Sequence, residues 1–151
     1  FKMSLEVQIT NDMKEAMRSK DKVALEAIRA IKGAIIIAKT DAGAKETMSP
    51  EEEIQLLSKL KKQRVDSATI FREQNRADLA EPEEAQIAII EKYLPAQLSE
   101  TEIKKTIVDI IAQTGASGMK DMGKVMGMAN GKMAGKADGK TISTIVKELL
   151  G

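Results

Sequence analysis

The chain of 151 residues has no cysteine, no histidine and no tryptophan, and its aromatic residues are only Phe1, Phe71 and Tyr93. The absence of cysteine excludes disulfides and thiolate chemistry, and the absence of histidine removes the most common general base and metal ligand. The acidic residues show neither the spacing of a calcium loop nor a paired-carboxylate motif. The sequence therefore predicts no catalytic residue, no metal site and no cofactor.

Long apolar stretches are also missing. Gly33–Ala38 is among the longest and is far too short to cross a bilayer, and no signal-peptide pattern opens the chain. We therefore expect a cytoplasmic protein with no membrane partner. The apolar residues that are present are mainly isoleucine, leucine, alanine and nine methionines, a composition that favours helices over a β-sandwich or barrel.

Periodic apolar residues predict four helices in the first part of the chain, at about residues 4–20, 22–39, 50–78 and 82–93, with a polar loop over Thr40–Met48. Ser49-Pro50-Glu51-Glu52 is a capping box with proline at the first helical position, which marks the start of the third helix. Leu79–Pro82 is expected to break that helix. Leu94-Pro95 should end the fourth, because a residue before proline avoids helical geometry.

A second capping box, Ser99-Glu100-Thr101-Glu102, opens a helix that should end near Gly115. Another helix is expected over Gly118–Ala134, with Met119 on its core face and Gly135 in the left-handed position after its end. Asp138 can cap a last helix. The predicted fold is all-α, with a four-helix domain at residues 1–95 and a three-helix domain at residues 96–151.

Half of the ten glycines recur at every fourth position near the carboxyl end, and five lysines step at the same interval. Residues four apart share a helix face, and each interior glycine costs about 1 kcal/mol relative to alanine. A bare face allows close approach by another helix or by a sugar-phosphate backbone, and lysines beside it favour a polyanion. Both interpretations stay open. The candidate RNA-binding residues are Lys120, Gly123, Lys124, Gly127, Gly131, Lys132, Gly135, Lys136, Gly139 and Lys140.

Net charge is only +1, but residues 118–151 carry six lysines against three acidic residues. The segment from Gly135 to Thr141 imitates a phosphate-binding loop. Its first glycine comes one residue too late for the motif, and a helix precedes it where a strand is required. No nucleotide site is therefore predicted, and a helix-to-helix turn explains the segment better.

Three polar side chains, Gln63, Arg64 and Ser67, project into the apolar face of the long third helix. A desolvated guanidinium needs a partner, and the fourth helix offers carboxylates at Glu81, Glu84 and Glu91. We interpret this structural polar cluster as an ion pair that orients two helices. Catalysis by Arg64 lacks a nearby nucleophile or base, and a contact with a partner is the remaining alternative.

Several motifs closely resemble those of the YqeY-like family: Lys62-Gln63-Arg64-Val65-Asp66-Ser67, Arg76-Ala77-Asp78-Leu79-Ala80, Tyr93-Leu94-Pro95, and the segments Asp121–Met126 and Gly135–Lys140. The likeness covers nearly the whole chain. It implies an all-helical protein related to the tail of the B subunit of tRNA-dependent amidotransferase. In that enzyme the tail faces the body of the tRNA. The family's glycine and lysine positions fall on Gly123, Lys124, Gly135, Lys136 and Gly139, and its aspartate on Asp138.

Three functions follow as hypotheses. The first is a non-catalytic module that binds structured RNA, with tRNA as the partner, through the glycine and lysine residues. The second is an accessory factor for glutamine-dependent amide transfer that acts with amidotransferase subunits. The resemblance implies a description as a carbon-nitrogen ligase, but it brings none of the catalytic domains of that enzyme. The third is a helical adaptor that binds a protein.

Overall fold

The computed structural model describes residues 4–41 and 47–151, so Phe1 and most of the expected loop after Thr40 lie outside the described residues. The chain forms two compact units, Phe1–Leu94 and Pro95–Gly151, called here the N-terminal and C-terminal units. All regular elements of the described residues are helical, and none of those residues lies in a strand. The predicted all-α class is confirmed.

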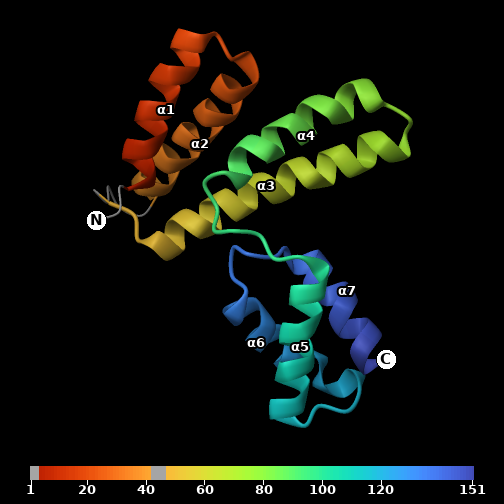
Figure 1. Ribbon diagram of the computed structural model, residues 1–151. Helices are drawn as coiled ribbons and strands as arrows, with labels where there is room; N and C mark the ends of the chain where they lie inside the picture. The colour runs from red at the N-terminus through yellow and green to blue at the C-terminus, as the bar shows by residue number, and fades with distance from the viewer. Residues whose placement is uncertain (1–3, 42–46) are drawn as a thin grey trace. The chain divides into compact units, whose positions relative to one another are not determined.

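The N-terminal unit consists of two helical hairpins (Figure 1). Helices α1 (Leu5–Ser19) and α2 (Lys22–Asp41) form the first hairpin, and α3 (Pro50–Glu73) and α4 (Ala77–Glu91) form the second. The two hairpins meet mainly where α2 packs against α4. Their core contains Leu5, Ile9, Ala16, Ile28, Ile31, Ile35, Leu57, Ile90 and Leu94.

The capping box predicted at the start of α3 is confirmed. The Ser49 hydroxyl accepts from the Glu52 N–H at 3.2 Å, and the Glu52 carboxylate accepts from the Ser49 N–H at 2.9 Å. The predicted break at Leu79–Pro82 is wrong, because α3 ends at Glu73 and Pro82 lies inside α4. Asn75 turns the chain instead, with a φ of 59°. Asparagine enters this left-handed region more readily than most residues, while the exposed Pro82 loses only one hydrogen bond near the start of α4.

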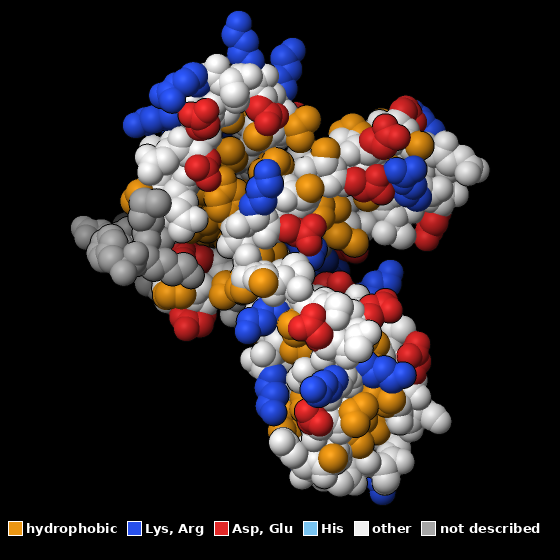
Figure 2. Space-filling view, viewed as in Figure 1, with side chains coloured by type: hydrophobic (Ala, Val, Ile, Leu, Met, Phe, Trp, Pro, Cys, Tyr) orange, Lys and Arg blue, Asp and Glu red, His pale blue; other side chains and the backbone are white. Residues whose placement is uncertain are grey.

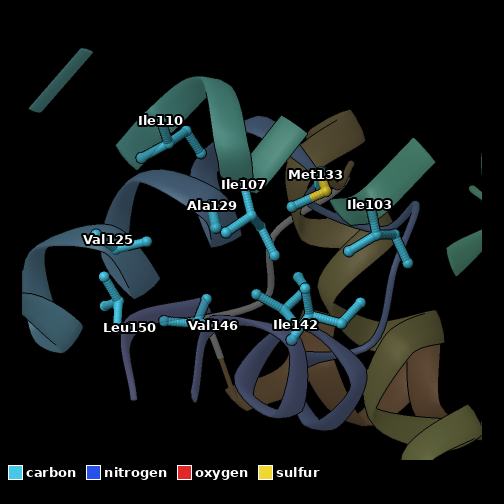
Figure 3. Close-up of a cluster of buried hydrophobic side chains, with 10 residues drawn as sticks. Ile103, Ile107, Ile110, Val125, Ala129, Met133, Ile142, Val146 and Leu150 are labelled. Atoms are coloured by element: carbon cyan, nitrogen blue, oxygen red, sulfur yellow. The ribbon is translucent and has the colours of Figure 1, made fainter. Parts of the chain in front are cut away.

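The C-terminal unit contains α5 (Glu100–Thr114), a short 3₁₀ turn η1 (Met119–Asp121), α6 (Met122–Lys132) and α7 (Gly139–Leu150). Their apolar faces enclose a core of Ile103, Ile107, Ile110, Val125, Ala129, Met133, Ile142, Ile145, Val146 and Leu150, most of which Figure 3 labels. The expected end of α5 near Gly115 is confirmed, and so is the left-handed backbone expected at Gly135. Gly115 follows α5 with a φ of 70°, and Gly135 lies in the turn after α6 with a φ of 74°.

The expected helix over Gly118–Ala134 is shorter than predicted at both ends. Residues 119–121 form the 3₁₀ turn, and α6 begins only at Met122. This change of geometry takes Met119 off the core face, and 48% of its surface is exposed. The prediction that Met119 belongs to the core is therefore wrong, because it extended one regular helix through the turn.

Charged side chains are distributed over the visible face of each unit (Figure 2). Within residues 4–41 and 47–151, no helix combines the length and the apolar character that a bilayer span requires.

Candidate nucleic-acid interface

Helix α6 separates a buried side from a bare side. Val125 and Ala129 are fully buried among α5 and α7, whereas Gly123, Gly127 and Gly131 are all exposed. Since residues four apart fall on one face of a helix, the three glycines line the side that is turned away from the core. We call this surface, together with Lys120 and Lys124, the glycine–lysine face. Lys132 is exposed at the end of α6, but it lies seven residues after the buried Val125 and so belongs to the other side of the helix.

The space over the three α6 glycines is open. A methyl carbon built at Gly123, Gly127 or Gly131 would have no neighbouring atom within 4 Å other than the helix's own backbone and chain neighbours. No helix of the described residues therefore uses these glycines for close packing. Of the two explanations for the glycine spacing, close approach by a helix of the same chain fails for the part of the molecule that the structure describes.

The other two glycines of the series lie outside α6, because that helix ends at Lys132. Gly135 occupies the left-handed position in the turn, and Gly139 is the first residue of α7. Asp138 caps α7 by accepting from the Thr141 N–H at 2.8 Å. The five glycines therefore do not form one continuous stripe: three define a helix face, and two shape the turn and helix start that follow it.

All five lysines of the series, Lys120, Lys124, Lys132, Lys136 and Lys140, are exposed. None of them forms an ion pair with a carboxylate of residues 4–41 or 47–151. The acidic residues nearest in sequence have structural contacts instead, since Asp121 accepts from the Ser117 N–H at 3.0 Å and Asp138 caps α7. The positive charge of this region is therefore not neutralised by local pairing.

The turn between α6 and α7 is tied to the segment that precedes α5. The Leu98 N–H donates to the Lys136 carbonyl at 2.8 Å, and the Gln97 side-chain amide donates to the Gly135 carbonyl at 2.7 Å. These bonds hold the main chain of Gly135 and Lys136 in a defined position. Lys136 and Lys140 consequently extend from a fixed turn, one on each side of the Asp138 cap.

The polar cluster of α3 has a different partner from the one expected. Arg64 is half-buried and donates to the Gln86 side-chain oxygen at 2.8 Å and to the Leu60 carbonyl at 3.1 Å. Gln86 in turn lies 3.5 Å from the Glu26 carboxylate of α2. The neighbouring polar residues are less enclosed: Ser67 is half-buried and Gln63 is exposed.

The expected carboxylates of α4 are engaged elsewhere. Glu84 pairs with Arg72 at 2.6 Å, and Glu91 pairs with Lys61 at 3.4 Å. The sequence prediction missed Gln86 because it considered only carboxylates of α4 as partners of Arg64. A neutral amide oxygen can accept the same hydrogen bond. Arg64 thus links three helices of the N-terminal unit through an amide.

No cluster of three or more potential metal ligands occurs among the described side chains. The surface features of the chain are therefore two packed helical units and a solvent-facing, cationic helix face. The class of protein that the described residues define is an all-helical protein of two small units.

The sequence pattern of the YqeY-like proteins matches residues 6–150, and the chain belongs to this family. It is 35% identical over 147 residues to "Altered inheritance of mitochondria protein 41, mitochondrial" of Pyrenophora tritici-repentis, which covers 93% of this chain and 77% of that protein. The protein of the same name from Meyerozyma guilliermondii is 34% identical over 134 residues, covering 85% of this chain and 67% of the relative.

A shorter match relates the chain to part of an amidotransferase. It is 37% identical over 70 residues to the E subunit of the glutamyl-tRNA(Gln) amidotransferase of Thermococcus gammatolerans, which amounts to 44% of this chain and 11% of that protein. The family and the relationship to a subunit of a tRNA-dependent amidotransferase, both indicated by the sequence motifs, are confirmed.

The relatives also correct one expectation. The two fungal proteins are mitochondrial by name, and this contradicts the cytoplasmic location expected from the sequence. That expectation used the lack of a signal-peptide pattern and of long apolar runs. Neither feature distinguishes one aqueous compartment of the cell from another.

Proposed function

We propose that this chain is a non-catalytic module that binds structured RNA, with tRNA as its partner, through the glycine–lysine face of the C-terminal unit. The observation that carries the proposal is the open space over Gly123, Gly127 and Gly131, beside exposed lysines without ion-pair partners among the described residues. The partial likeness to a subunit of a glutamyl-tRNA(Gln) amidotransferase supports tRNA as the class of RNA.

The chemistry of the face suits a sugar-phosphate backbone. Without side chains on the α6 glycines, a ligand strand can approach the main chain closely, and 2′-hydroxyls can donate to helix carbonyls. The ammonium groups of Lys120 and Lys124 supply the phosphate contacts that position a nucleic acid. Lys136 and Lys140 extend the same positive charge along the turn into α7.

The scarcity of aromatic residues selects the kind of RNA. Proteins that bind single strands stack bases on aromatic side chains, and the C-terminal unit contains no aromatic residue. A folded RNA, recognised by its shape and backbone, does not need such stacking. The composition therefore supports a structured ligand.

Filter binding of tRNA across a series of salt concentrations tests the proposal. Replacing Lys120 and Lys124 with alanine should reduce the slope of log affinity against log salt by about one to two. A matched control replaces Lys104 and Lys105, two exposed lysines of α5 in the same unit, and should leave the slope nearly unchanged. Equal slopes for the wild type and the Lys120/Lys124 variant, or no tRNA binding by the wild type, would contradict the proposal.

A second candidate function is supported by the same partial match. The chain would then act as an accessory factor of glutamine-dependent amide transfer and would associate with amidotransferase subunits. Adding the purified chain to a reconstituted glutamyl-tRNA(Gln) amidotransferase should raise the rate of amide formation. An unchanged rate at saturating amounts of the chain would dispose of this candidate.

A helical adaptor that binds a protein partner predicts a different biochemical result. Affinity capture with and without ribonuclease separates this function from RNA binding. Partners that remain bound after ribonuclease treatment would support the adaptor function, whereas partners that are lost would support the RNA-binding module.

A further inference from the structure

The two hairpin ends of the N-terminal unit differ in how their positive charges are paired. At the end between α3 and α4, Arg72 pairs with Glu84 at 2.6 Å and Arg76 pairs with Asp78 at 3.1 Å. At the end between α1 and α2, neither Lys20 nor Lys22 has an ion pair with any carboxylate of the described residues. The positive charges at the α3–α4 end are therefore neutralised by local ion pairs, whereas Lys20 and Lys22 at the α1–α2 end are not.

The acidic residues beside the α1–α2 turn have other contacts. Residues 14–22 contain four basic and two acidic residues, which leaves a surplus of two positive charges. Glu15 pairs with Arg18 at 3.0 Å, and the Asp21 carboxylate accepts from the Ala24 N–H at 3.0 Å, as the cap of α2. Lys14, Lys20 and Lys22 are exposed and have no ion-pair partner among the described residues, so these lysines carry the charge surplus.

Further charged residues lie along α2, where the exposed Glu26 falls between Lys22 and Arg29 on the same side of the helix. Arg29 is exposed and lies seven residues after Lys22, which is almost two full helical turns, or about 10 Å along the axis. The two side chains therefore project from the same side of α2. Together with Lys14 and Lys20 they form a set that we call the hairpin cations: Lys14, Lys20, Lys22 and Arg29.

The backbone of Lys20 adds an independent observation. This residue ends α1 in the left-handed region, with a φ of 58°. Glycine is the residue that adopts this position without steric cost, and lysine is not. Stability alone would therefore favour glycine at the turn, and strain of this kind is often retained where the side chain has a use.

We propose that the hairpin cations form a further contact for the sugar-phosphate backbone of a structured RNA, on the N-terminal unit. This inference rests on the proposed RNA-binding function and extends it to a surface that the glycine–lysine face does not include.

An anionic membrane surface is the competing ligand, because Met17 is exposed next to the hairpin cations. Stable attachment to a membrane takes more than one weak signal, and a single exposed methionine inserts little apolar area. The sugar-phosphate backbone proposed for the glycine–lysine face can bind the hairpin cations through their positive charge alone, without an inserted apolar side chain. The RNA backbone is therefore the occupant that the observations favour.

The main test compares two triple variants of the full chain by filter binding of tRNA at several salt concentrations. Replacing Lys14, Lys22 and Arg29 with alanine should lower the salt slope by about two to three, because each lost phosphate contact removes about 0.7 to 0.9. The control replaces Lys62, Arg72 and Arg76 with alanine. It removes the same number of positive charges, but these three side chains are already paired with carboxylates. It should change the slope by about one or less.

A single substitution separates binding from folding. Lys20→Gly removes a cation and relieves the left-handed backbone, so it should raise the Tm by a few degrees while reducing tRNA affinity at low salt by about threefold. A role of Lys20 in stability alone would give the opposite sign in Tm. Unchanged affinity in Lys20→Gly would count against the inference.

The outcomes distinguish this inference from the proposed function. A normal salt slope in the Lys14/Lys22/Arg29 variant, with a reduced slope in the Lys120/Lys124 variant, overturns the hairpin contact and leaves the glycine–lysine face intact. The reverse pattern supports the hairpin contact and overturns the proposed face. Binding to vesicles of phosphatidylserine and phosphatidylcholine that is lost in Met17→Gln, without binding to tRNA, overturns both.

Discussion

The hydroxyl of Tyr93, just after α4, donates a 2.5 Å hydrogen bond to the carboxylate of Asp12 in α1. The bond joins residues 81 positions apart and links the end of the second hairpin of the N-terminal unit to the first. Tyr93 is half-buried, and both burial and the neighbouring carboxylate raise the pKa of its hydroxyl well above the usual value of 10.0. The neutral phenol is therefore the form that the fold favours.

This pKa can be measured directly, because Tyr93 is the only tyrosine and the chain has no tryptophan. A titration followed by tyrosinate absorbance should show ionisation well above pH 10 in the folded protein. Since the folded pKa is raised, the stability that it contributes is complete below about pH 10 and is lost as the pH rises through the folded value. Asp12→Asn should lower the tyrosine pKa, while Glu15→Gln should leave it unchanged.

The same substitution should have opposite effects at two glycines of the C-terminal unit. Gly127→Ala should stabilise α6 by up to about 1 kcal/mol, because the site is helical and open. Gly135→Ala should cost about 1 to 2 kcal/mol, because its φ of 74° disfavours a side chain. Urea denaturation of both variants measures the difference, and effects of the same sign would show that the backbone assignments are wrong.

The capping box at α5 predicts a dependence of stability on pH. Hydrogen bonds from the N–H and hydroxyl of Ser99 lower the pKa of the Glu102 carboxyl below its usual 4.5. Because the folded pKa is depressed, the stabilisation is present above about pH 4.5 and is lost as the pH falls through the folded value. Glu102→Gln should therefore flatten the stability profile on the acid side. Thermal unfolding between pH 3 and 7, in ~0.5-unit steps, is the measurement, with Glu100→Gln as the control.

Replacing Gln86 should reduce the stability of the N-terminal unit more than replacing Arg64, its hydrogen-bond partner. Gln86→Leu deprives a half-buried guanidinium of its side-chain acceptor and should destabilise the N-terminal unit by about 1 to 3 kcal/mol. Arg64→Met removes the charge together with its need for a partner and should cost less. A larger loss for Arg64→Met in urea denaturation would show that the arginine's own packing matters more than its hydrogen bond.

The two helix starts that carry capping boxes were predicted correctly, because their signals are local. At Ser49 and Ser99 the capping serine and the glutamate three residues later meet within one turn, so their spacing in the sequence already defines the contact. The break between α3 and α4 was misplaced because Pro82 is a stronger local signal than Asn75. The structure accommodates that proline inside a helix and uses the asparagine for the turn.

The partner of Arg64 could not be read from the sequence. Gln86 lies 22 positions away on another helix, and only the packing of α3 against α4 brings the two side chains together. The same limit applies to the hairpin cations. Their excess charge depends on which acidic residues are occupied by capping and pairing, and those contacts exist only in the folded chain.

Composition and spacing were sufficient for the all-helical class, the helix caps and the four-residue period of glycine and lysine, since each depends on residues within a few turns of one another. Tertiary structure decided that α6 ends before Gly135, that Gly123, Gly127 and Gly131 face open space, and that the lysines beside them have no carboxylate partners among the described residues. The physical reason is that the spacing of residues along a helix shows which of them share a side. Only the packing of other helices determines whether that side is covered or open to solvent.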